Sequence, residues 1–392
     1  MKNNCALILG GYINGYSIIR ELYEKGLRNI ILFDYHASLA SKSNKILFYR
    51  KIEKTSESLK KALTELKLNF DYIIIYPTDD LQIEHLHTIY HEIREFCFIP
   101  FNYDNIIESL NKFVQYQYCE ANGIPYPKTL CIESIHDLKK NEEISYPILI
   151  RPIKRDDLNT LVFRSLFLDS LETYSKNKPR LIKFLESGQQ FVVSEVIPGD
   201  DTNIYAYVAY RSQKGEILSE WAGKKLTQFP DRYGVFASAS NEAPEIVCVQ
   251  GRKLLETMNL KGICEPEFKY DLRDGKFKLT EINLRSMMWH RVGNLSGVNI
   301  QYAQYLDAIG QEVPTQMQDK RNVVHFVYMT HEIINLFSRC GYWKHFKYNV
   351  LSAPKKEFAV FDSNDIKPFI FNLLPSLKAL FGRWLRVLKI KQ

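Results

Sequence analysis

The sequence predicts a mixed α/β and α+β protein, in which a parallel sheet at the N-terminus is followed by antiparallel sheets with helices and by a helical C-terminal extension. Continuous apolar runs at Cys5–Leu9, Asn29–Asp34 and Tyr72–Tyr76 alternate with helical patterns, which is typical of a parallel sheet with helices on both faces. In the middle of the chain, apolar runs instead flank short polar turns, which is typical of antiparallel hairpins. We expect ligands at the carboxyl ends of the N-terminal strands.

The composition narrows the class of protein. The chain has 392 residues, enough for two or three domains or one large composite fold. Apolar residues make up 45% and charged residues 25%, which excludes a wholly disordered chain, a collagen and a coiled-coil rod. The net charge of +7 is mild, and a dedicated nucleic-acid-binding protein is usually more basic and more clustered in charge. We therefore expect no nucleic-acid partner.

The cysteines and the N-terminus predict a cytoplasmic protein. There are seven cysteines and no C-x-x-C motif, which disfavours a disulfide framework and a zinc ribbon and favours a reducing compartment. The apolar run Ala6–Leu9 is too short for a signal-peptide core. No stretch reaches the roughly 18 apolar residues of a membrane span.

The N-terminal region continues with a glycine turn and helices. The turn Gly10–Gly15 fits neither G-x-G-x-x-G nor a P-loop. It is either a tight strand-to-helix turn that needs small residues or a helix N-terminus that faces an anionic substrate. Helical spacing follows at Tyr16–Lys25 and again at Ser56–Leu66, which is amphipathic.

Histidines are concentrated in the next predicted helix. His85, His87, His91 and Glu92 lie close together in sequence, and His87 and His91 are four residues apart. The pattern is not H-E-x-x-H. Solvated helix histidines are the favoured interpretation over metal ligands.

A further helix is predicted over residues 105–122, because glycine and prolines follow it. The strand at Tyr146–Pro152 ends with Arg151, and another strand is predicted at Gln190–Ile197.

Two hairpins follow in the sequence. The first pairs Ile204–Arg211 with Glu216–Trp221, and the second pairs Phe268–Tyr270 with Lys276–Ile282 around a D-G turn.

The second hairpin carries the most informative polar residues. Glu281 and Asn283 are two apart and face one side of a strand, and pairing around the turn brings Glu267 near the same edge. Two carboxylates about 4 Å apart repel by about 4 kcal/mol at an effective dielectric constant near 20. A divalent cation such as Mg²⁺, which prefers hard oxygen ligands, offsets that repulsion. Arg285 adds a cation suited to a phosphate or carboxylate. The alternative is two surface glutamates on a hairpin.

A succession of motifs resembles the ATP-grasp superfamily, over roughly residues 1–310. Those enzymes join a carboxylate to an amine with ATP and Mg²⁺, and the chain is most similar to the D-aspartate ligase and carbamoyl-phosphate-synthetase-like type. The segment Phe361–Phe369 is similar to the ending of that subgroup. The motifs are Asn111-Lys112, Gly-Ile-Pro-Tyr-Pro-Lys (123–128), Tyr-Pro-Ile-Leu-Ile-Arg-Pro (146–152), Ser-Glu-Val-Ile-Pro-Gly-Asp-Asp (194–201), Glu267 and Glu-Ile-Asn-Leu-Arg (281–285).

The resemblance implies a role for each matching residue. By this resemblance, the phosphates of ATP are contacted by Lys112 and Arg151, the adenine hinge is formed by Glu195 with the backbone of Val196 and Ile197, and the ribose is held by Asp201. Mg²⁺ is held by Glu267, Glu281 and Asn283. The acyl-phosphate intermediate is stabilised by Arg285. The basic residues Lys224, Lys225 and Arg232, in a segment interpreted as a loop over 222–234, are placed near the γ-phosphate or the acid. Basic loop residues are also commonly just solvated. No Ser or Cys nucleophile is expected.

The sequence departs from the superfamily pattern at two places. The segment 153–160 has no glycine where relatives carry a glycine-rich phosphate lid, so that either Lys154 and Arg155 contact the phosphates by side chain or the lid is degenerate. The usual Asn-Pro-Arg is Asn283-Leu284-Arg285. In the segment that follows, Met287, Met288 and Trp289 are expected in the core, and Arg291 is a candidate substrate contact. Cys264 is expected to be a buried strand residue.

The last residues predict a basic amphipathic helix over Ser376–Lys391. Its apolar side chains recur at helical spacing, and no acid follows Asp365 while six bases do. Such a helix lies on an anionic membrane surface or packs on the body of the protein, and the two alternatives are near even. Contact of residues 376–392 with a membrane suggests a lipid-linked substrate at the inner face of the membrane.

Together these observations predict four domains and one function. The domains are a Rossmann-like pre-ATP-grasp domain over 1–104, the small ATP-grasp subdomain over 105–190, the large subdomain with the metal site over 191–312, and a C-terminal extension over 313–392. The predicted function is a Mg-ATP-dependent carboxylate–amine ligase acting in cell-envelope polysaccharide or peptidoglycan precursor modification, with a homodimer common among relatives. The alternatives are a carboxylate kinase or carboxylase-like relative, and a nucleotide-binding module without turnover.

Overall fold

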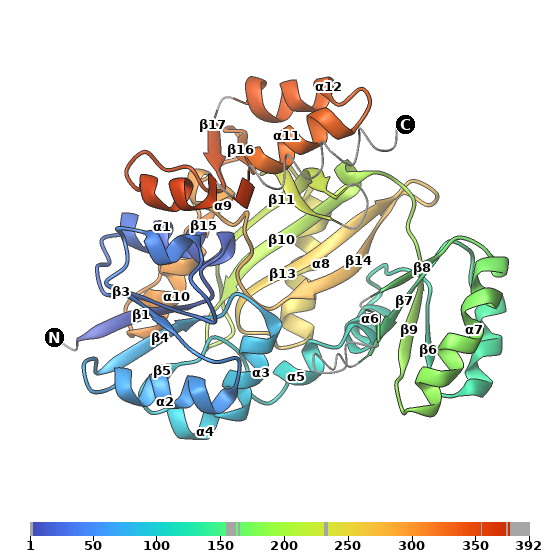
Figure 1. Ribbon diagram of the computed structural model, residues 1–392, viewed down its shortest axis with the longest axis horizontal. Coiled ribbons are helices and arrows are strands. Elements are labelled where there is room, and N and C mark those ends of the chain that lie inside the picture. The colour runs from blue at the N-terminus through green and yellow to red at the C-terminus, as the bar shows by residue number, and fades with distance from the viewer. Residues whose placement is uncertain are drawn as a thin grey trace. The chain divides into compact units, whose positions relative to one another are not determined.

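The computed structural model describes residues 3–153, 162–163, 165–230, 234–353, 355–373 and 375–376. The chain forms two compact units, which alternate along the sequence. Unit 1 comprises Met1–Ile106, Asp200–Glu265 and Asn283–Gln392, and unit 2 comprises Ile107–Gly199 and Pro266–Ile282. Figure 1 shows the elements of both units.

Unit 1 begins with the predicted parallel sheet (Figure 1). Its strand order is β3-β2-β1-β4-β5, and every neighbouring pair is parallel. The three predicted apolar runs form its three central strands, which are almost wholly buried because helices cover the sheet. The strands are β1 (Asn4–Leu9), β2 (Ile30–Asp34), β3 (Phe48–Lys51), β4 (Tyr72–Tyr76) and β5 (Cys97–Phe98), and the main helices are α1 (Ile13–Glu24) and α2 (Ser56–Leu66).

The histidine-rich segment forms two helices and not one. They are α3 (Asp80–Thr88) and α4 (Tyr90–Ile93). A capping box starts α3, because the Asp79 carboxylate accepts from the backbone N–H of Gln82 and the Gln82 side chain reaches back to the Asp79 backbone. The break at Ile89 was not predicted, since nothing in the sequence marks it.

Among the described residues, the second sheet has eight strands. Its order is β14-β13-β10-β11-β12-β16-β17, and β15 (Gln316–Met317) pairs with β11. The two predicted hairpins form its core as β10 (Ile204–Arg211) with β11 (Ile217–Phe229), and as β13 (Gly262–Asp271) with β14 (Lys276–Asn283). The strands β13 and β14 each pass from one unit into the other. Helix α8 (Glu245–Thr257) and strand β12 (Val235–Ser240) complete this region.

The C-terminal extension was predicted to be helical, but it also contributes the strands β15, β16 and β17 to the second sheet. The strand β16 (Val324–Val327) is buried and pairs antiparallel with β12, and β17 (Lys355–Phe358) pairs parallel with β16. These strands cover what would otherwise be an exposed sheet edge. Its helices include α11 (Met329–Ser338), α12 (Trp343–Phe346) and the π-helix at Lys347–Ser352, and residues 366–373 are also helical. Apart from Ser376, the predicted basic helix lies outside the described residues.

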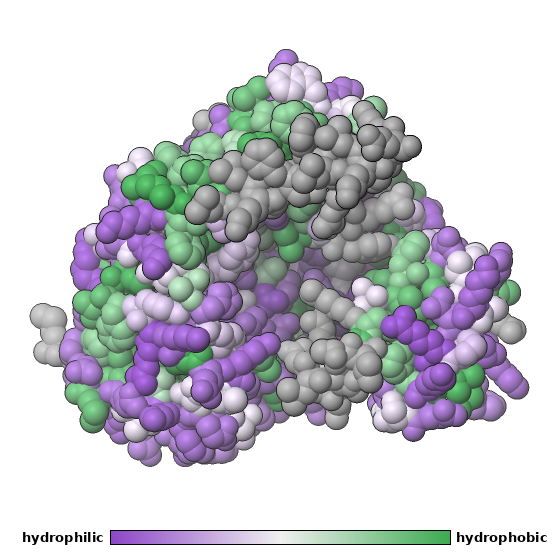
Figure 2. Space-filling model, in the orientation of Figure 1, coloured by the Kyte–Doolittle hydropathy of each residue, from purple (hydrophilic) through white to green (hydrophobic). Residues whose placement is uncertain are grey.

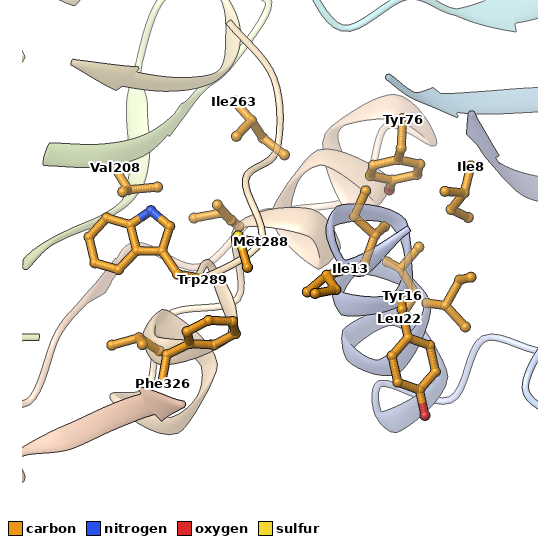
Figure 3. Packing of buried hydrophobic residues seen from close by; sticks show 14 of the residues in the cluster. Ile8, Ile13, Tyr16, Leu22, Tyr76, Val208, Ile263, Met288, Trp289 and Phe326 are labelled. Atoms are coloured by element: carbon orange, nitrogen blue, oxygen red, sulfur yellow. The ribbon is translucent and has the colours of Figure 1, made fainter. Parts of the chain in front are cut away.

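One hydrophobic core joins the two sheets of unit 1. Met288 and Trp289 lie in it as predicted, close to the short helices α9 (Arg291–Leu295) and α10 (Ile300–Ala308). Trp289 is fully buried and stacks on Phe236, with ring centroids 4.7 Å apart. Figure 3 shows this packing for Ile8, Ile13, Tyr16, Leu22, Tyr76, Val208, Ile263, Met288, Trp289 and Phe326.

Unit 2 contains a four-stranded antiparallel sheet. The order is β6 (Thr129–Ile132), β9 (Phe191–Glu195), β7 (Ile148–Pro152) and β8 (Leu166–Leu168). Helix α7 (Leu171–Glu186) buries one apolar face, and Figure 2 shows hydrophilic side chains over its exposed face. A 3₁₀ segment spans Ile135–Glu143.

The prediction of a single helix over 105–122 is wrong, because two helices lie in this range. They are α5 (Ile106–Ser109) and α6 (Lys112–Asn122). Asn111 caps α6, since its Oδ1 accepts from the backbone N–H of Phe113 at 2.9 Å. Gly123 ends α6 in the left-handed conformation that glycine tolerates.

The cysteines form no disulfide. All seven lie within the described residues, and all are free thiols there. Cys264 is buried on β13. None of the helices in the described ranges combines the length and the apolarity needed to cross a bilayer.

Candidate functional site

The centre of the candidate site in unit 2 is an ion pair between Lys112 and Glu281. Lys112 is the first residue of α6, and Glu281 lies near the end of β14. The Lys112 Nζ donates to Glu281 Oε2. The side chains are 23% and 38% exposed, so that both remain accessible to a small ligand.

Two side chains of α6 fasten the helix to the strand beside Glu281. The Gln115 side chain accepts from the Ile282 backbone N–H at 3.1 Å and donates to the Ile282 carbonyl at 3.4 Å. The Tyr116 hydroxyl donates to the Thr280 carbonyl at 2.9 Å. These bonds lie on both sides of Glu281 in the sequence, and they therefore fix the register that sets Lys112 against the carboxylate.

The charges around Lys112 come from three further elements. Burial lowers the pKa of Lys112, and Arg151 on β7 lowers it further, while Glu281 and Glu267 act in the opposite direction. Thr280 on β14 donates from its hydroxyl to the Glu267 carbonyl at 3.0 Å. Unit 2 thus brings together four predicted residues, two cations and two carboxylates.

The predicted metal ligands include only two acidic side chains. No group of three or more His, Cys, Asp or Glu side chains in the described ranges is arranged to hold a metal ion. The predicted set has two carboxylates and the amide of Asn283, which belongs to unit 1.

Glu195, predicted at the adenine hinge, has a side chain that is committed to other protein groups. Its carboxylate accepts from Arg273 Nη2 at 2.9 Å, from Lys278 Nζ at 3.4 Å and from the Lys128 backbone N–H at 3.1 Å. The same two cations bind the buried Asp271. The Val196 backbone N–H donates to the Pro147 carbonyl at 2.8 Å. This network fixes the end of β9 and the hairpin turn, and the sequence analysis missed it.

In unit 1, Asn283 is held by a carboxylate that the sequence analysis also missed. Its Nδ2 donates to Glu265 Oε1 at 3.3 Å. Glu265 is fully buried, and its Oε2 accepts from Trp289 Nε1 at 2.9 Å and lies 2.7 Å from His290 Nε2. Glu265 shares a strand face with Glu267, two residues on, and this alternation was the available signal.

Arg285 lies on a separate ion pair within unit 1. Its Nε donates to Asp80 Oδ1 at 2.7 Å, and Asp80 opens helix α3. Burial raises the pKa of the neighbouring Asp79, and Arg285 opposes that shift. Arg285 also lines a small, open cleft, together with Tyr76, Pro77, Pro100, Ile263, Leu284, Ser286 and Gln304.

The basic segment 222–234 is a strand and not a loop over most of its length. Lys224 and Lys225 lie in β11, which continues to Phe229 because it pairs with β12. Lys225 is buried, with its Nζ 3.3 Å from Gln228 Oε1 and 4.5 Å from the centre of the Phe236 ring. Lys224 pairs with Glu242 at 3.7 Å. Arg232, Lys154 and the lid segment 154–160 lie outside the described residues.

Asp201 and Arg291 have protein partners in unit 1. The Asp201 carboxylate accepts from the Gln228 backbone N–H at 3.1 Å and pairs with Arg339 at 3.3 Å. Arg291 is buried and pairs with Glu24 at 2.7 Å. The charge of Arg291 is therefore balanced within the protein, and its role as a substrate contact stays a prediction.

The glycine turn at the start of unit 1 is a tight strand-to-helix turn. A Cβ on Gly15 would lie 1.9 Å from the Gly10 carbonyl oxygen, so that only glycine fits there. The backbone N–H of Gly11 donates to Asp34 Oδ2 at 2.8 Å. This donor is therefore satisfied by the protein's own carboxylate. In the next helices, His87 stacks on Tyr103 with ring centroids 4.5 Å apart, and His91 Nε2 lies 3.0 Å from the Tyr103 hydroxyl.

Comparison with known proteins gives one relative in sequence and many in structure. No family model matches the chain. D-aspartate ligase of Enterococcus faecium (strain Aus0004) is 27% identical over 221 residues, which are 53% of this chain and 52% of that protein. The chain thus spans about half the length of this curated relative.

Solved structures share the fold over most of the chain. N5-carboxyaminoimidazole synthetase of Staphylococcus aureus, complexed with ADP, matches with a TM-score of 0.61 at 13% identity, over 80% of this chain and 79% of that one. L-amino acid ligase of Bacillus licheniformis matches with a TM-score of 0.57 at 15% identity, over 79% and 75%. These likenesses confirm the predicted fold class, the ATP-grasp fold with an N-terminal parallel sheet.

Proposed function

We propose that this chain is a Mg²⁺- and ATP-dependent ligase that joins a carboxylate to an amine and releases ADP and phosphate. The observation that carries the proposal is the similarity to D-aspartate ligase in a chain with an ATP-grasp fold. The convergence of Lys112, Arg151, Glu267 and Glu281 in unit 2 supports it.

The proposed metal ligands are Glu267, Glu281 and Asn283, with Mg²⁺ as the ion. The donor set fits the ion, because carboxylate and amide oxygens are hard ligands. Glu281 already faces a positive charge, the Lys112 ammonium. When bound, the ion neutralises negative charge on the phosphate oxygens of the nucleotide.

The proposed phosphate contacts are Lys112 and Arg151, with Lys154 from the segment after β7. Lys112 now neutralises Glu281. If Glu281 held Mg²⁺, Lys112 would no longer be needed to neutralise that carboxylate, and its ammonium would be available to phosphate oxygens. The ion pair therefore keeps an accessible carboxylate neutralised until the nucleotide arrives.

The remaining nucleotide contacts are proposed from the resemblance. The hinge comprises Glu195, Val196 and Ile197, and Asp201 is assigned to the ribose. Because the Glu195 side chain binds Arg273 and Lys278, its part in a hinge falls to the backbone. The ion pairs then serve to hold that backbone still.

The proposed chemistry follows from the weakness of a carboxylate as an electrophile. Transfer of the γ-phosphoryl group to the carboxylate gives an acyl phosphate with a good leaving group, and an amine then attacks the acyl carbon. Arg285 steadies the acyl phosphate, and Lys225 and Arg232 are placed near the acid in the same proposal. Catalysis consists of positioning and of neutralising the growing negative charge. No covalent intermediate with the protein is needed.

The proposed substrates are a small-molecule or lipid-linked carboxylate and an amine, in the modification of a cell-envelope polysaccharide or peptidoglycan precursor. The motive is the basic, amphipathic sequence of residues 376–392, which would bring the enzyme to the inner face of the membrane from the cytoplasm. Removing these residues should abolish binding to anionic liposomes. Unchanged binding would reject the membrane contact but not the ligase activity. We also propose that the protein forms a homodimer.

A phosphate-release screen tests the function. Purified full-length protein is supplied with ATP, Mg²⁺ and panels of sugar acids, amino acids and amines, and products are identified by mass spectrometry. We expect ADP release that requires both an acid and an amine, and an amide product. Release that needs no amine would favour a carboxylate kinase or carboxylase-like activity. Nucleotide binding without release across the whole panel would favour a binding module.

A further inference from the structure

Within the described part of the chain, the carboxylate of Glu265 is buried without a lysine or arginine among its hydrogen-bond partners. Its exposed fraction is zero, and its three neighbours are the side chains of Asn283, Trp289 and His290. All four residues belong to unit 1. A buried carboxylate is costly unless its oxygens accept hydrogen bonds, so this arrangement requires donors at every contact.

The donors on one side of Glu265 are fixed by chemistry. The indole Nε1–H of Trp289 can only donate, and it lies 2.9 Å from Oε2. His290 Nδ1 accepts from the Met287 backbone N–H at 3.2 Å, so that the proton of the neutral ring is on Nε2, 2.7 Å from the same oxygen. Oε2 is therefore held as an acceptor of two bonds.

The other oxygen fixes the amide of Asn283. Glu265 Oε1 can only accept, so the group of Asn283 that faces it at 3.3 Å is the amide nitrogen Nδ2. The amide oxygen Oδ1 is consequently the atom turned away from Glu265. Asn283 itself is 8% exposed, and its orientation is thus set from inside the core.

We propose that Glu265 is a positioning residue, which holds the Asn283 amide with its oxygen, and not its nitrogen, directed to the metal of the bound nucleotide. The proposal rests on the function proposed above, because it takes Asn283 as a metal ligand. It goes further in assigning a role to Glu265, Trp289 and His290, which act through Asn283 and touch neither metal nor substrate.

Glu265→Gln exchanges donor and acceptor in the hydrogen bond between residue 265 and Asn283. The amide oxygen of the new glutamine stays with the two donors, Trp289 and His290, and its NH₂ replaces Oε1. That NH₂ must donate, so Asn283 turns to offer Oδ1 to it and directs Nδ2 outward. Because a metal-site partner of this kind changes affinity by about 10- to 100-fold, we expect metal binding at least about tenfold weaker.

Asn283→Asp should restore binding in the Glu265→Gln variant and weaken it in the wild type. In the double variant, one oxygen of the introduced aspartate accepts from the glutamine and the other remains directed outward. In the single variant, the introduced aspartate and Glu265 are two carboxylates in direct contact, which repel. The same substitution thus has opposite signs in the two backgrounds, which a mere addition of charge to the site would not produce.

The experiment measures Mn²⁺ binding by electron paramagnetic resonance, in the presence of ADP, on the full-length protein. The set is wild type, Glu265→Gln, Asn283→Asp, the double variant and Glu332→Gln. Glu332 is the matched control, because it too is fully buried and accepts from Thr227, Ser238, Tyr342 and Asn349. The melting temperature of each variant reports its folding.

The outcomes separate this inference from the proposed function. Loss in Glu265→Gln, recovery to within about threefold of wild type in the double variant, and unchanged Mn²⁺ affinity in Glu332→Gln support the inference. Failure of the double variant to recover, tighter binding by Asn283→Asp alone, or an equal loss in Glu332→Gln overturns it. If the wild type itself binds no Mn²⁺ with ADP, the proposed function fails and the inference fails with it.

Discussion

Lys112 and Glu281, which are 169 residues apart in sequence, form an ion pair between the first residue of α6 and the end of β14. A helix of unit 2 therefore supplies the counter-charge for a carboxylate that the sequence assigns to a metal. This pairing connects the proposed phosphate contact with the proposed metal ligand before any nucleotide is present.

The first prediction concerns Glu281→Gln. The amide keeps the shape of the side chain but removes the charge that binds both Lys112 and the proposed metal. We expect turnover to fall by about a hundredfold or more, while the melting temperature changes little, because the pair is partly exposed. Steady-state ADP release and thermal unfolding measure the two effects.

Glu220→Gln is the matched control for Glu281→Gln. Glu220 is bound by Arg252, whose Nε lies 2.8 Å from the Glu220 Oε2, but it has no assigned role in the reaction. Its substitution should leave turnover unaffected at a small cost in stability. Full activity of Glu281→Gln would contradict the metal assignment.

The fold was predicted best where one local pattern decides the structure. The apolar runs of β1, β2 and β4 were correctly predicted as buried strands. The helix predicted over Ser56–Leu66 has the same bounds as α2. Lys225 was assigned to a loop because the segment 222–234 contains several polar residues and Pro230, a composition typical of loops. Pairing with β12 extends β11 through Lys225 as far as Phe229. Local sequence does not reveal such pairing between segments.

The sequence predicted several residues of the candidate site, but not the hydrogen bonds and ion pairs that hold them. Glu267, Glu281 and Asn283 are in motifs, and their positions in β13 and β14 follow from the hairpin. Glu265 escaped notice because its donors, Trp289 and His290, are 24 and 25 residues away. Its spacing from Glu267 places it on the same strand face, but the role of a buried glutamate becomes clear only when the donors that satisfy it are known.

The second prediction concerns Arg285. Replacement by lysine keeps the charge but loses the planar fork that binds two oxygens at once. We expect Arg285→Lys to lower turnover by about a hundredfold, with nucleotide affinity changed by less than about threefold, because Arg285 is assigned to the acyl phosphate and not to ATP. Turnover and equilibrium binding of ADP separate the two.

Asp80→Asn serves as the control for Arg285→Lys. It removes the partner of Arg285, whose Nε lies 2.7 Å from Asp80 Oδ1, but leaves the guanidinium in place. Because Asp80 is 45% exposed, its loss should be worth at most about 1 kcal/mol. Damage as great as that of Arg285→Lys would show that the ion pair, and not the guanidinium fork, matters.

The third prediction concerns the glycine turn before α1. A Cβ at residue 15 would meet the Gly10 carbonyl at 1.9 Å, and the turn must open to admit it. We expect Gly15→Ala to lower the free energy of unfolding by about 2–3 kcal/mol, as measured by urea denaturation. The adjacent Asn14→Ala, which loses one bond of 3.2 Å to the Thr78 carbonyl, should cost only about 1 kcal/mol. Equal costs would argue against steric exclusion.

The last prediction is a dependence of stability on acid pH that originates at Asp271. This carboxylate is fully buried, and Arg273, then Lys278, hold its pKa well below the ordinary value of 3.8 against the opposing effect of burial. In the unfolded chain the group takes up a proton near pH 4, whereas in the folded protein it stays ionised to lower pH. The unfolded state therefore binds more protons below about pH 4, and the stabilisation, complete above that pH, is lost as the pH falls toward the folded pKa.

Asp271→Asn should remove this dependence along with the ion pairs themselves. We expect a loss of about 2 kcal/mol at neutral pH, and a difference from wild type that shrinks progressively as the pH is lowered below about 4, in urea unfolding monitored from about pH 7 to about pH 2.5. Glu172→Gln is the control, because its pair with Lys176 has side chains 76% and 69% exposed and contributes little at any pH. A constant difference between wild type and Asp271→Asn across the whole range would mean that Asp271 titrates alike in both states, and that Arg273 and Lys278 bind it without favouring its charge.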